Sequence, residues 1–362
     1  MNLLLIIGTR PNFIKITRFK EITLSYPNIN LKIAHTGQHY DATMADVFFK
    51  QFNLTPDYFL NVGNGSPNFQ IAEIMTKLEE LITTKFKPDL IIVVGDVNST
   101  LAGALTANKL NIKLAHIESG LRSFDGTMPE EHNRILTDKI CDLYFVTEPS
   151  GIENLKREGV QEEKLKFVGN TMIDTLVAFS DKIEQADVLE KLKLTSKVFV
   201  LTTIHRPATV DNEEGLNKLI QLFKSITQKY KVVFPIHPRT VSNLKKFNLY
   251  EELTQNKDII ITEPLDYFAF QKLIKHSKFI ITDSGGIQEE STFLQVPCLT
   301  LRNNTERPIT CTEGTNTLVK FDIHEINQLI TEIESGTYKR GKIPELWDGH
   351  ATERIFKVLG EL

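Results

Sequence analysis

Short apolar runs rich in β-branched residues alternate with segments of helical periodicity along the whole chain. This alternation is typical of parallel sheets whose two faces are both covered by helices. Six runs in the first half predict strands, at 2–7, 31–36, 89–95, 113–117, 142–147 and 165–168. Five runs in the second half predict strands at 197–204, 230–236, 258–262, 278–282 and 296–300. Apolar residues at helical spacing between 71 and 82 predict an amphipathic helix.

Two series of strands in 362 residues indicate an α/β protein with two Rossmann-like, doubly wound domains. The first domain is predicted over 1–172 and the second over 173–346, because a new series of strands begins near Lys197. The last segment, 347–362, has apolar residues at helical spacing. We expect it to return to the first domain as a helix.

The overall charge and the cysteines exclude several classes of protein. The formal net charge is -4 and basic residues are spread along the chain, so no global field attracts nucleic acid or an anionic membrane. The three cysteines, Cys141, Cys298 and Cys311, are odd in number and lack metal-binding spacing. The first apolar run is too short for a signal peptide or a membrane span. These features predict a cytoplasmic protein with free thiols and no membrane insertion.

The segment after the first predicted strand has the features of an anion site. Gly8 permits a tight turn, Pro11 suits the first position of a helix, and Arg10 and Lys15 place two cations near the helix start. The sequence G-x-G-x-x-G is absent from this position, which counts against a classical NAD enzyme. Taken alone, the segment is equally consistent with a solvated arginine and lysine.

Carboxylates follow two further strands of the first domain. Asp96 comes directly after an apolar run and Gly95, where it can act as a base or an orienting acid, or else cap the next helix. Glu118 ends the strand at 113–117. In doubly wound sheets ligands bind at these carboxyl ends, so both residues are catalytic candidates.

Two more carboxylates, Glu130 and Glu131, occupy the first turn of a helix that begins at Pro129. Glu130 is expected to pair with Arg134 four residues later and to complement the helix dipole. Glu131 points about 100° away from Glu130 and has no partner at that spacing. Glu131 is therefore the better catalytic candidate.

The second domain has two strand ends that carry histidine and arginine. His205 and Arg206 follow one strand, and His237 and Arg239 follow the next. A single such histidine is more often structural than catalytic. Two of these endings on neighbouring strands favour an anionic ligand.

A glycine-rich turn between a strand and a helix follows at Ser284-Gly285-Gly286. Its backbone N–H groups can approach a diphosphate at the positive end of the helix dipole. Glu290 lies four residues after Gly286 on the same helical face and can accept hydrogen bonds from a ribose. With Arg307 downstream, the segment predicts a site for a nucleotide sugar.

The motifs GTRP, GD, ESGLR, PEE.NR, HR, DSGGIQEE and TERP, taken in this order, resemble those of the non-hydrolysing UDP-N-acetylglucosamine 2-epimerases over nearly the whole chain. The resemblance implies the fold also used by GT-B glycosyltransferases, with both domains facing a central cleft. It implies a catalytic set of Asp96, Glu118, Glu131 and His205. It implies contacts to a UDP-sugar from Arg10, Lys15, Phe270, Ser284, Gly285, Gly286, Glu290 and Arg307.

The resemblance also implies a reaction. C2 of a UDP-amino sugar is inverted by elimination of UDP to a 2-acetamidoglucal and re-addition of UDP after protonation on the other face. This route uses donors on the leaving diphosphate and carboxylates at C2, and it implies no cofactor and no metal. The expected substrate is a UDP-amino sugar, and the expected assembly is a homodimer.

The chain departs from the family pattern at four places. Asn12-Phe13 replaces Glu-Ala, Pro207-Ala208-Thr209 replaces Arg-Glu-Asn, Leu265 stands where many members have glutamine, and Val47, after Gln38-His39, stands where allosterically activated members have a second glutamine. These departures favour relatives that act on other UDP-amino sugars, such as diacetamido-glucuronate or deoxyhexosamine forms.

Three alternatives share the same nucleotide site. A hydrolysing 2-epimerase would release free UDP, and a GT-B glycosyltransferase would require an acceptor. A non-catalytic nucleotide-sugar sensor would bind without turnover. The cluster of Asp96, Glu118 and Glu131 favours an epimerase over the last two, because neither has an evident use for three such carboxylates.

Overall fold

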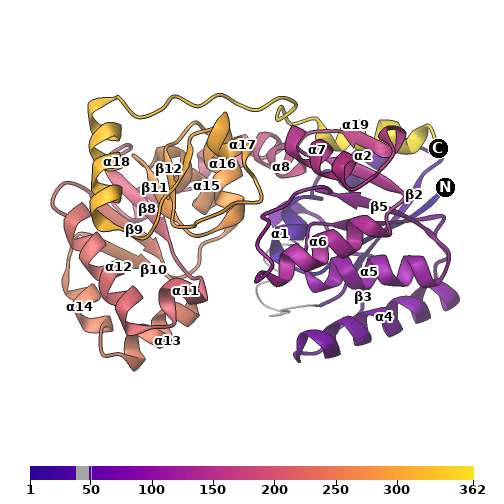
Figure 1. Cartoon of the computed structure of the whole chain (residues 1–362), viewed down its shortest axis with the longest axis horizontal. Coiled ribbons are helices and arrows are strands. Elements are labelled where there is room, and N and C mark those ends of the chain that lie inside the picture. Colours follow the sequence, from indigo (N-terminus) through magenta and orange to yellow (C-terminus); the bar gives the residue numbers. More distant parts are fainter. Residues whose placement is uncertain (38–48, 50) are drawn as a thin grey trace. The chain divides into compact units, whose positions relative to one another are not determined.

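The computed structural model describes residues 1–37, 49 and 51–362. Within them the chain forms two compact units (Figure 1). Unit 1 comprises Met1–Ala178 and Glu345–Leu362, and unit 2 comprises Phe179–Pro344. Gln38, His39 and Val47, which were singled out in the sequence, lie outside the described residues.

Unit 1 contains a seven-stranded parallel sheet in the order β3-β2-β1-β4-β5-β6-β7. Its strands are β1 (Asn2–Ile7), β2 (Asn30–His35), β3 (Tyr58–Phe59), β4 (Leu90–Val94), β5 (Lys113–Ile117), β6 (Leu143–Val146) and β7 (Leu165–Phe167). Its helices are α1 (Arg10–Ile14), α2 (Phe19–Thr23), α4 (Pro67–Thr84), α5 (Asn98–Lys109), α6 (Pro129–Lys139), α7 (Pro149–Arg157), the 3-10 helix η1 (Glu162–Lys164), α8 (Thr171–Ala178) and α19 (Ala351–Gly360).

Unit 2 contains a six-stranded parallel sheet in the order β10-β9-β8-β11-β12-β13. Its strands are β8 (Phe199–Thr203), β9 (Lys231–Pro235), β10 (Ile259–Thr262), β11 (Ile280–Thr282), β12 (Cys298–Thr300) and β13 (Asn316–Leu318). Its helices are α9 (Ser180–Gln185), α10 (Val188–Lys191), α11 (Pro207–Val210), α12 (Glu213–Ile226), α13 (Pro238–Lys246), α14 (Tyr250–Gln255), α15 (Tyr267–His276), α16 (Gly285–Phe293), α17 (Ile309–Thr312) and α18 (Ile323–Ser335).

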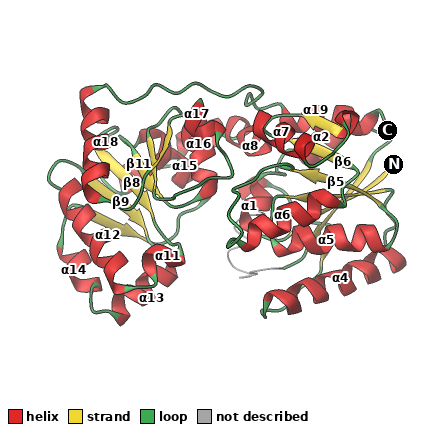
Figure 2. Cartoon of the chain, in the orientation of Figure 1, coloured by secondary structure: helices red, strands yellow, loops and turns green. Residues whose placement is uncertain are grey.

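The predicted α/β class is confirmed, and the strands of both units alternate with helices along the chain (Figure 2). Consecutive residues of β8 show why the strands are apolar throughout. Val200 packs in a core with α12 and α18, whereas Phe199 and Leu201 pack in a second core with α15. Because side chains alternate between the two faces of a strand, both faces of this sheet are buried.

All predicted strands are present, with ends that differ by at most two residues. The edge strands β3 and β13 were not predicted, because β3 has only two residues and β13 begins with polar residues. The predicted helix at 71–82 extends over α4. It begins earlier because the Ser66 hydroxyl accepts a hydrogen bond from the Phe69 amide and Pro67 occupies the first turn.

The C-terminal segment belongs to unit 1 for identifiable reasons. The indole of Trp347 is buried and donates to the Thr147 carbonyl over 3.1 Å. The buried carboxylate of Asp174, in α8, accepts hydrogen bonds from the amides of Ala351 and Thr352 at the start of α19. The sequence placed the domain boundary near 172, at the start of α8, whereas the unit boundary lies at the end of this helix.

Candidate functional site

The carboxyl ends of β1, β4 and β5 lie side by side in unit 1, because these strands are neighbours in the sheet. Gly8 follows β1 in close contact with the start of α5. A Cβ atom on Gly8 would lie 2.0 Å from the Ser99 Oγ, so only glycine fits this turn. Arg10, at the start of α1, is exposed.

Asn12, one of the departures from the family pattern, is a structural residue of this turn. Its Oδ1 accepts hydrogen bonds from the amides of Gly8 and Thr9, and its Nδ2 donates to the Val94 carbonyl over 3.0 Å. The side chain is 2% exposed. Asn12 thus ties the start of α1 to the end of β4.

Lys15 and Glu118 form a buried ion pair next to Gly95. Gly95 has φ +68°, and a Cβ atom there would lie 3.2 Å from the Glu118 Oε2 and 3.3 Å from the Lys15 Nζ. Glycine is therefore required here, both for its backbone conformation and for the close approach of the pair. Lys15 was predicted as an anion-binding cation, and the structure pairs it with a predicted catalytic carboxylate.

Glu118 has φ +70°, a left-handed conformation that is uncommon for residues other than glycine. Its amide donates to the Phe145 carbonyl over 3.1 Å, which fixes the backbone at this point. Strained backbone of this kind is concentrated at functional sites. The strain therefore supports a functional reading of Glu118.

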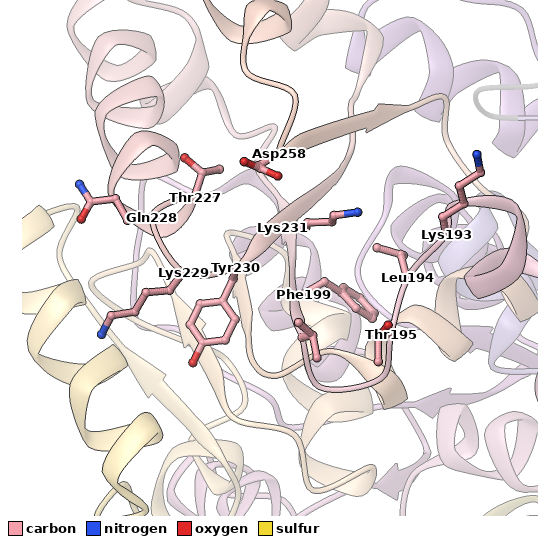
Figure 3. A pocket seen from close by; sticks show the side chains of 11 residues that line it. Lys193, Leu194, Thr195, Phe199, Thr227, Gln228, Lys229, Tyr230, Lys231 and Asp258 are labelled. Atoms are coloured by element: carbon pink, nitrogen blue, oxygen red, sulfur yellow. The ribbon is translucent and has the colours of Figure 1, made fainter.

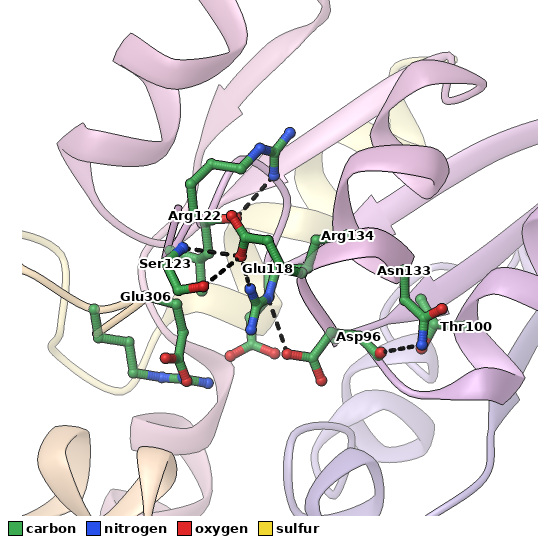
Figure 4. Close-up of polar contacts among 12 residues, drawn as sticks. Asp96, Thr100, Glu118, Arg122, Ser123, Asn133, Arg134 and Glu306 are labelled. Atoms are coloured by element: carbon green, nitrogen blue, oxygen red, sulfur yellow. Dashed lines mark hydrogen bonds and ion pairs between the residues drawn. The ribbon is translucent and has the colours of Figure 1, made fainter. Parts of the chain in front are cut away.

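Asp96 and Glu131 are joined by Arg134. Figure 4 shows Arg134 beside Asp96. The Arg134 Nε lies 3.0 Å from the Asp96 Oδ2, and the Arg134 Nη1 contacts the Glu131 Oε2. The expected pairing of Arg134 with Glu130 is wrong. Glu131, for which no partner was expected at a spacing of four residues, pairs with Arg134 at a spacing of three. Glu130 is exposed, whereas the turn of α6 brings Arg134 and Glu131 together three residues apart.

His116, at the end of β5, is fully buried between two acceptors. Its Nδ1 lies 2.7 Å from the Asp138 Oδ1 and its Nε2 lies 2.8 Å from the Gly95 carbonyl oxygen. A carboxylate and a carbonyl oxygen are hydrogen-bond acceptors, so each ring nitrogen of His116 faces an acceptor. Burial by itself would raise the pKa of Asp138, but His116 and Arg122 beside it hold this pKa below its ordinary value.

In unit 2, a buried aspartate binds residues at the carboxyl end of the neighbouring strand. Asp283 follows β11, and its Oδ2 accepts hydrogen bonds from the amides of His205 (2.9 Å) and Arg206 (2.7 Å) after β8. The Asp283 Oδ1 lies 3.0 Å from the His205 Nδ1. The side chain of His205 is 42% exposed. Asp283 therefore holds the backbone of the predicted catalytic histidine and places a carboxylate oxygen beside its partly exposed ring.

The second histidine and arginine of unit 2 have structural partners. His237 packs beside His205 with ring centroids 5.8 Å apart, and its Nδ1 accepts from the Arg239 amide. The Arg239 guanidinium binds the carboxylate of Asp211 through two nitrogens. Burial, with some contribution from His205 and Arg239, lowers the pKa of His237. Its ring is therefore neutral near pH 7.

The glycine-rich turn starts α16 as predicted, with Ser284 at the N-cap position. Ser284, Gly285 and Gly286 are partly exposed. A Cβ atom on Gly285 would lie 2.8 Å from the Glu306 Oε1. The turn thus leaves backbone N–H groups near the surface at the positive end of a nine-residue helix.

Arg307 is buried between two carboxylates, Glu289 and Glu306. Glu306 also binds Arg302, with 2.9 Å between its Oε2 and the Arg302 Nη2. The residue Glu290 is buried in α16. Phe270, in α15, is partly buried against the core that contains β8. Arg307 is therefore part of a charge network, and not an isolated cation at the surface.

Several residues that contact the predicted site residues in the structure were not predicted from the sequence. Asp283, Arg134, Asp138 and Glu306 each bind a candidate residue or its neighbour. Asp283 had a usable signal, because it follows an apolar strand as Asp96 does. The others lie within helices or loops, where sequence spacing gives no such signal.

Two hollows of unit 2 lie at the amino ends of its strands, opposite the carboxyl ends that carry the predicted site residues. One, of about 300 Å³, is lined by residues that precede β8, β9 and β10, among them Leu194, Tyr230 and Asp258 (Figure 3). The other, of about 410 Å³, is lined by residues that precede β12 and β13 and by the end of α18. Neither hollow contains a predicted site residue, since those residues follow the strands.

Neither a metal-binding cluster nor a membrane-spanning helix is present in the described ranges. No group of three or more histidine, cysteine or carboxylate side chains is placed there to hold a metal ion. No helix in the same ranges combines the length and the apolar character needed to cross a membrane.

Comparison with known proteins places these features in a family. Residues 23–360 match the family model described as UDP-N-acetylglucosamine 2-epimerase. The chain is 41% identical over 365 residues to the UDP-N-acetylglucosamine 2-epimerase of Methanocaldococcus jannaschii, covering 99% of each chain. It is 37% identical to the UDP-2,3-diacetamido-2,3-dideoxy-D-glucuronate 2-epimerase of Pseudomonas aeruginosa, covering 100% of each chain.

Solved structures agree with this result. The M. jannaschii UDP-GlcNAc 2-epimerase in complex with UDP-GlcNAc and UDP matches with a TM-score of 0.89, 39% identity and 100% coverage of both chains. The Neisseria meningitidis enzyme bound to UDP-GlcNAc matches with a TM-score of 0.89 and 29% identity, again over 100% of both chains. The chain is an enzyme of the isomerase class and belongs to the UDP-N-acetylglucosamine 2-epimerase family.

Proposed function

We propose that the enzyme is a non-hydrolysing epimerase that inverts C2 of a UDP-N-acetylamino sugar. The observation that carries the proposal is the position of two carboxylates at neighbouring strand ends of unit 1. Glu118 lies in strained backbone against Lys15, and its carboxylate is next to Gly95, the residue before Asp96. Acid-base chemistry at a carbon centre uses such a pair.

The proposed reaction begins with cleavage of the bond between C1 and the diphosphate oxygen. UDP leaves with the bonding electrons, a carboxylate takes the proton from C2, and a C1–C2 double bond forms. In the second half a proton is added to the opposite face of C2, and UDP adds back to C1. One group must accept a proton and another must donate one on the other face, and we assign Asp96 and Glu118 to this pair of roles.

We assign the nucleotide end of the substrate to unit 2. The N–H groups at the start of α16 suit a diphosphate, and the exposed part of the His205 ring can donate to the leaving oxygen. Glu290 is assigned to the ribose, and Phe270 to the uracil side. Arg10 of unit 1 is assigned to the sugar nucleotide as an exposed cation.

The route through the glucal predicts the isotope content of the product. In deuterium oxide, product should carry deuterium at C2, because the proton returned comes from an enzyme acid that exchanges with solvent. Oxygen label between C1 and the phosphate should scramble into the non-bridging positions while UDP is detached. NMR of the product measures both, with an enzyme-free incubation of substrate as control. Protium at C2 together with unscrambled oxygen would rule out the elimination route.

The sugar is tested with a substrate panel. One named relative acts on UDP-N-acetylglucosamine and another on the 2,3-diacetamido-glucuronate derivative, so both belong in the panel with UDP-deoxyhexosamines. Free UDP is assayed in each reaction. Accumulation of UDP with free sugar, in place of epimerised UDP-sugar, would indicate the hydrolysing reaction instead.

Glu290→Ala is expected to weaken binding of UDP by about 10- to 100-fold, because a charged acceptor contributes about 1.5–3 kcal/mol to a hydrogen bond. Isothermal titration with UDP measures the change. Glu251→Ala, at an exposed glutamate of α14, is the matched control. Arg307→Ala is a less selective test, since it leaves Glu289 and Glu306 without this buried cation. Unchanged affinity in Glu290→Ala would place the ribose elsewhere.

A further inference from the structure

We propose that Arg134 and Glu131 are positioning residues that act on the reaction through Asp96. This proposal rests on the proposed function. Arg134 binds the carboxylate of Glu131, in α6, and the carboxylate of Asp96, after β4. The side chain of Arg134 is 2% exposed. Its planar guanidinium has donors in a fixed fork, so the position of one carboxylate sets that of the other. Glu131 is thereby a support for Asp96, with no proton transfer of its own.

The hydrogen bonds of Glu131 argue against a role in proton transfer. Its Oε2 accepts from the Ser123 amide and hydroxyl, each over 2.9 Å, and contacts Arg134. Its Oε1 accepts from the Phe124 amide over 2.9 Å. A carboxyl group that took up a proton here would have to give up an interaction with one of these donors.

Asp96 has the opposite character. Its Oδ2 binds Arg134, its side chain is 24% exposed, and its Oδ1 accepts no hydrogen bond from the part of the chain that the structure describes. One oxygen is therefore anchored and the other is available to a ligand. This is the arrangement expected of a carboxylate that is held in place to act on a substrate.

Asn133, the residue before Arg134, holds the main chain of the same aspartate. Its Nδ2 donates to the Asp96 carbonyl over 2.9 Å. Two consecutive residues of α6 thus fix both the backbone and the side chain of Asp96 (Figure 4). The start of α6 is in turn tied to the 123–124 turn through Glu131. This network therefore holds Asp96 through its main-chain carbonyl and through its carboxylate.

The test is a set of double-mutant cycles against Asp96→Asn, with turnover of the UDP-acetamido sugar followed by NMR over long incubations. In the parent background we expect Arg134→Lys and Glu131→Gln each to lower kcat by about 10- to 100-fold through misplacement of the aspartate, with KM changed much less. In the Asp96→Asn background neither should lower kcat further, because residues that act as one unit are not additive.

Arg122→Lys is the matched control. Arg122 is a second buried arginine of unit 1, but it binds Asp138 and Glu158, so any effect it has should multiply with that of Asp96→Asn. If Arg134→Lys does not fold, Asn133→Ala replaces it and should show the same lack of additivity. Losses from Glu131→Gln that multiply with Asp96→Asn would overturn this inference alone. A parent enzyme that turns over no UDP-acetamido sugar would overturn it together with the proposed function.

Discussion

Glu118→Gln is expected to lower turnover by about 10²- to 10⁴-fold, the range found when a group in proton transfer or charge stabilisation is lost. Glutamine has nearly the same shape, and its amide oxygen can still accept a hydrogen bond from Lys15. It cannot exchange a proton, and it removes the negative charge that faces the buried ammonium. We therefore expect a folded protein, less stable than the parent, that has lost its chemistry.

The comparison should be made with Glu130→Gln, at an exposed glutamate in the first turn of α6. This control removes a carboxylate from the same unit without touching the Lys15–Glu118 pair, and its turnover should equal that of the parent. Initial rates with saturating substrate give kcat, and circular dichroism confirms the fold of both variants. Parent-like turnover in Glu118→Gln would remove this residue from the mechanism.

The strands and the class of the fold could be predicted from the sequence because their signal is local. A buried parallel strand such as β4 is a run of apolar residues, and its end is marked by Gly95. The polar residue that follows such a run then lies at the ligand-binding edge. This reasoning identified Asp96 and Glu118, and it applies equally to Asp283, which was not predicted as a site residue.

The partners of these residues could not be predicted in the same way. Arg134 pairs with Asp96 across 38 positions of sequence, because α6 packs against α5, which begins at Asn98, just after Asp96. The sequence assigned Arg134 to Glu130 on the basis of spacing within the helix. A spacing rule ranks pairs along one helix, but a buried arginine takes the acceptors that the tertiary structure provides.

Lys15 and Arg307 illustrate the same limit for cations. Both were interpreted as donors to an anionic ligand, and both are buried beside carboxylates. A sequence shows that a cation is present, but it does not show whether the charge is already balanced within the fold. In the structure each of these cations forms ion pairs with carboxylates of its own unit, and its contact with an anionic ligand stays a prediction.

Asp138→Ala is expected to lower the free energy of unfolding of unit 1 by about 3–5 kcal/mol, the cost of breaking a buried ion pair on one side. The aspartate is 1% exposed and accepts from His116 (2.7 Å), Arg122 (2.8 Å) and the Gly120 amide (3.0 Å). Its removal leaves the His116 ring and the Arg122 guanidinium without this acceptor in the interior.

The same interaction sets a pH dependence. The pKa of Asp138 is lower in the folded protein than its ordinary value, so the carboxylate stabilises the fold at any pH above its unfolded pKa of about 3.9. This contribution is lost as the pH falls below about 4 and through the folded pKa. In Asp138→Ala, this part of the acid-induced loss of stability should be absent.

The single tryptophan of the chain makes this measurement specific to one unit. Trp347 is 1% exposed and donates to the Thr147 carbonyl within unit 1, so its fluorescence in urea reports the unfolding of that unit. Glu158→Gln is the control, because Glu158 binds Arg122 from a more exposed position and its loss should cost only about 1 kcal/mol. If Asp138→Ala unfolds at the same urea concentration as Glu158→Gln, the buried aspartate does not stabilise His116 and Arg122 as the geometry indicates. If the buried network stabilises unit 1, Asp138→Ala should unfold at a lower urea concentration than Glu158→Gln. Its free energy of unfolding should also fall less with decreasing pH than that of the parent.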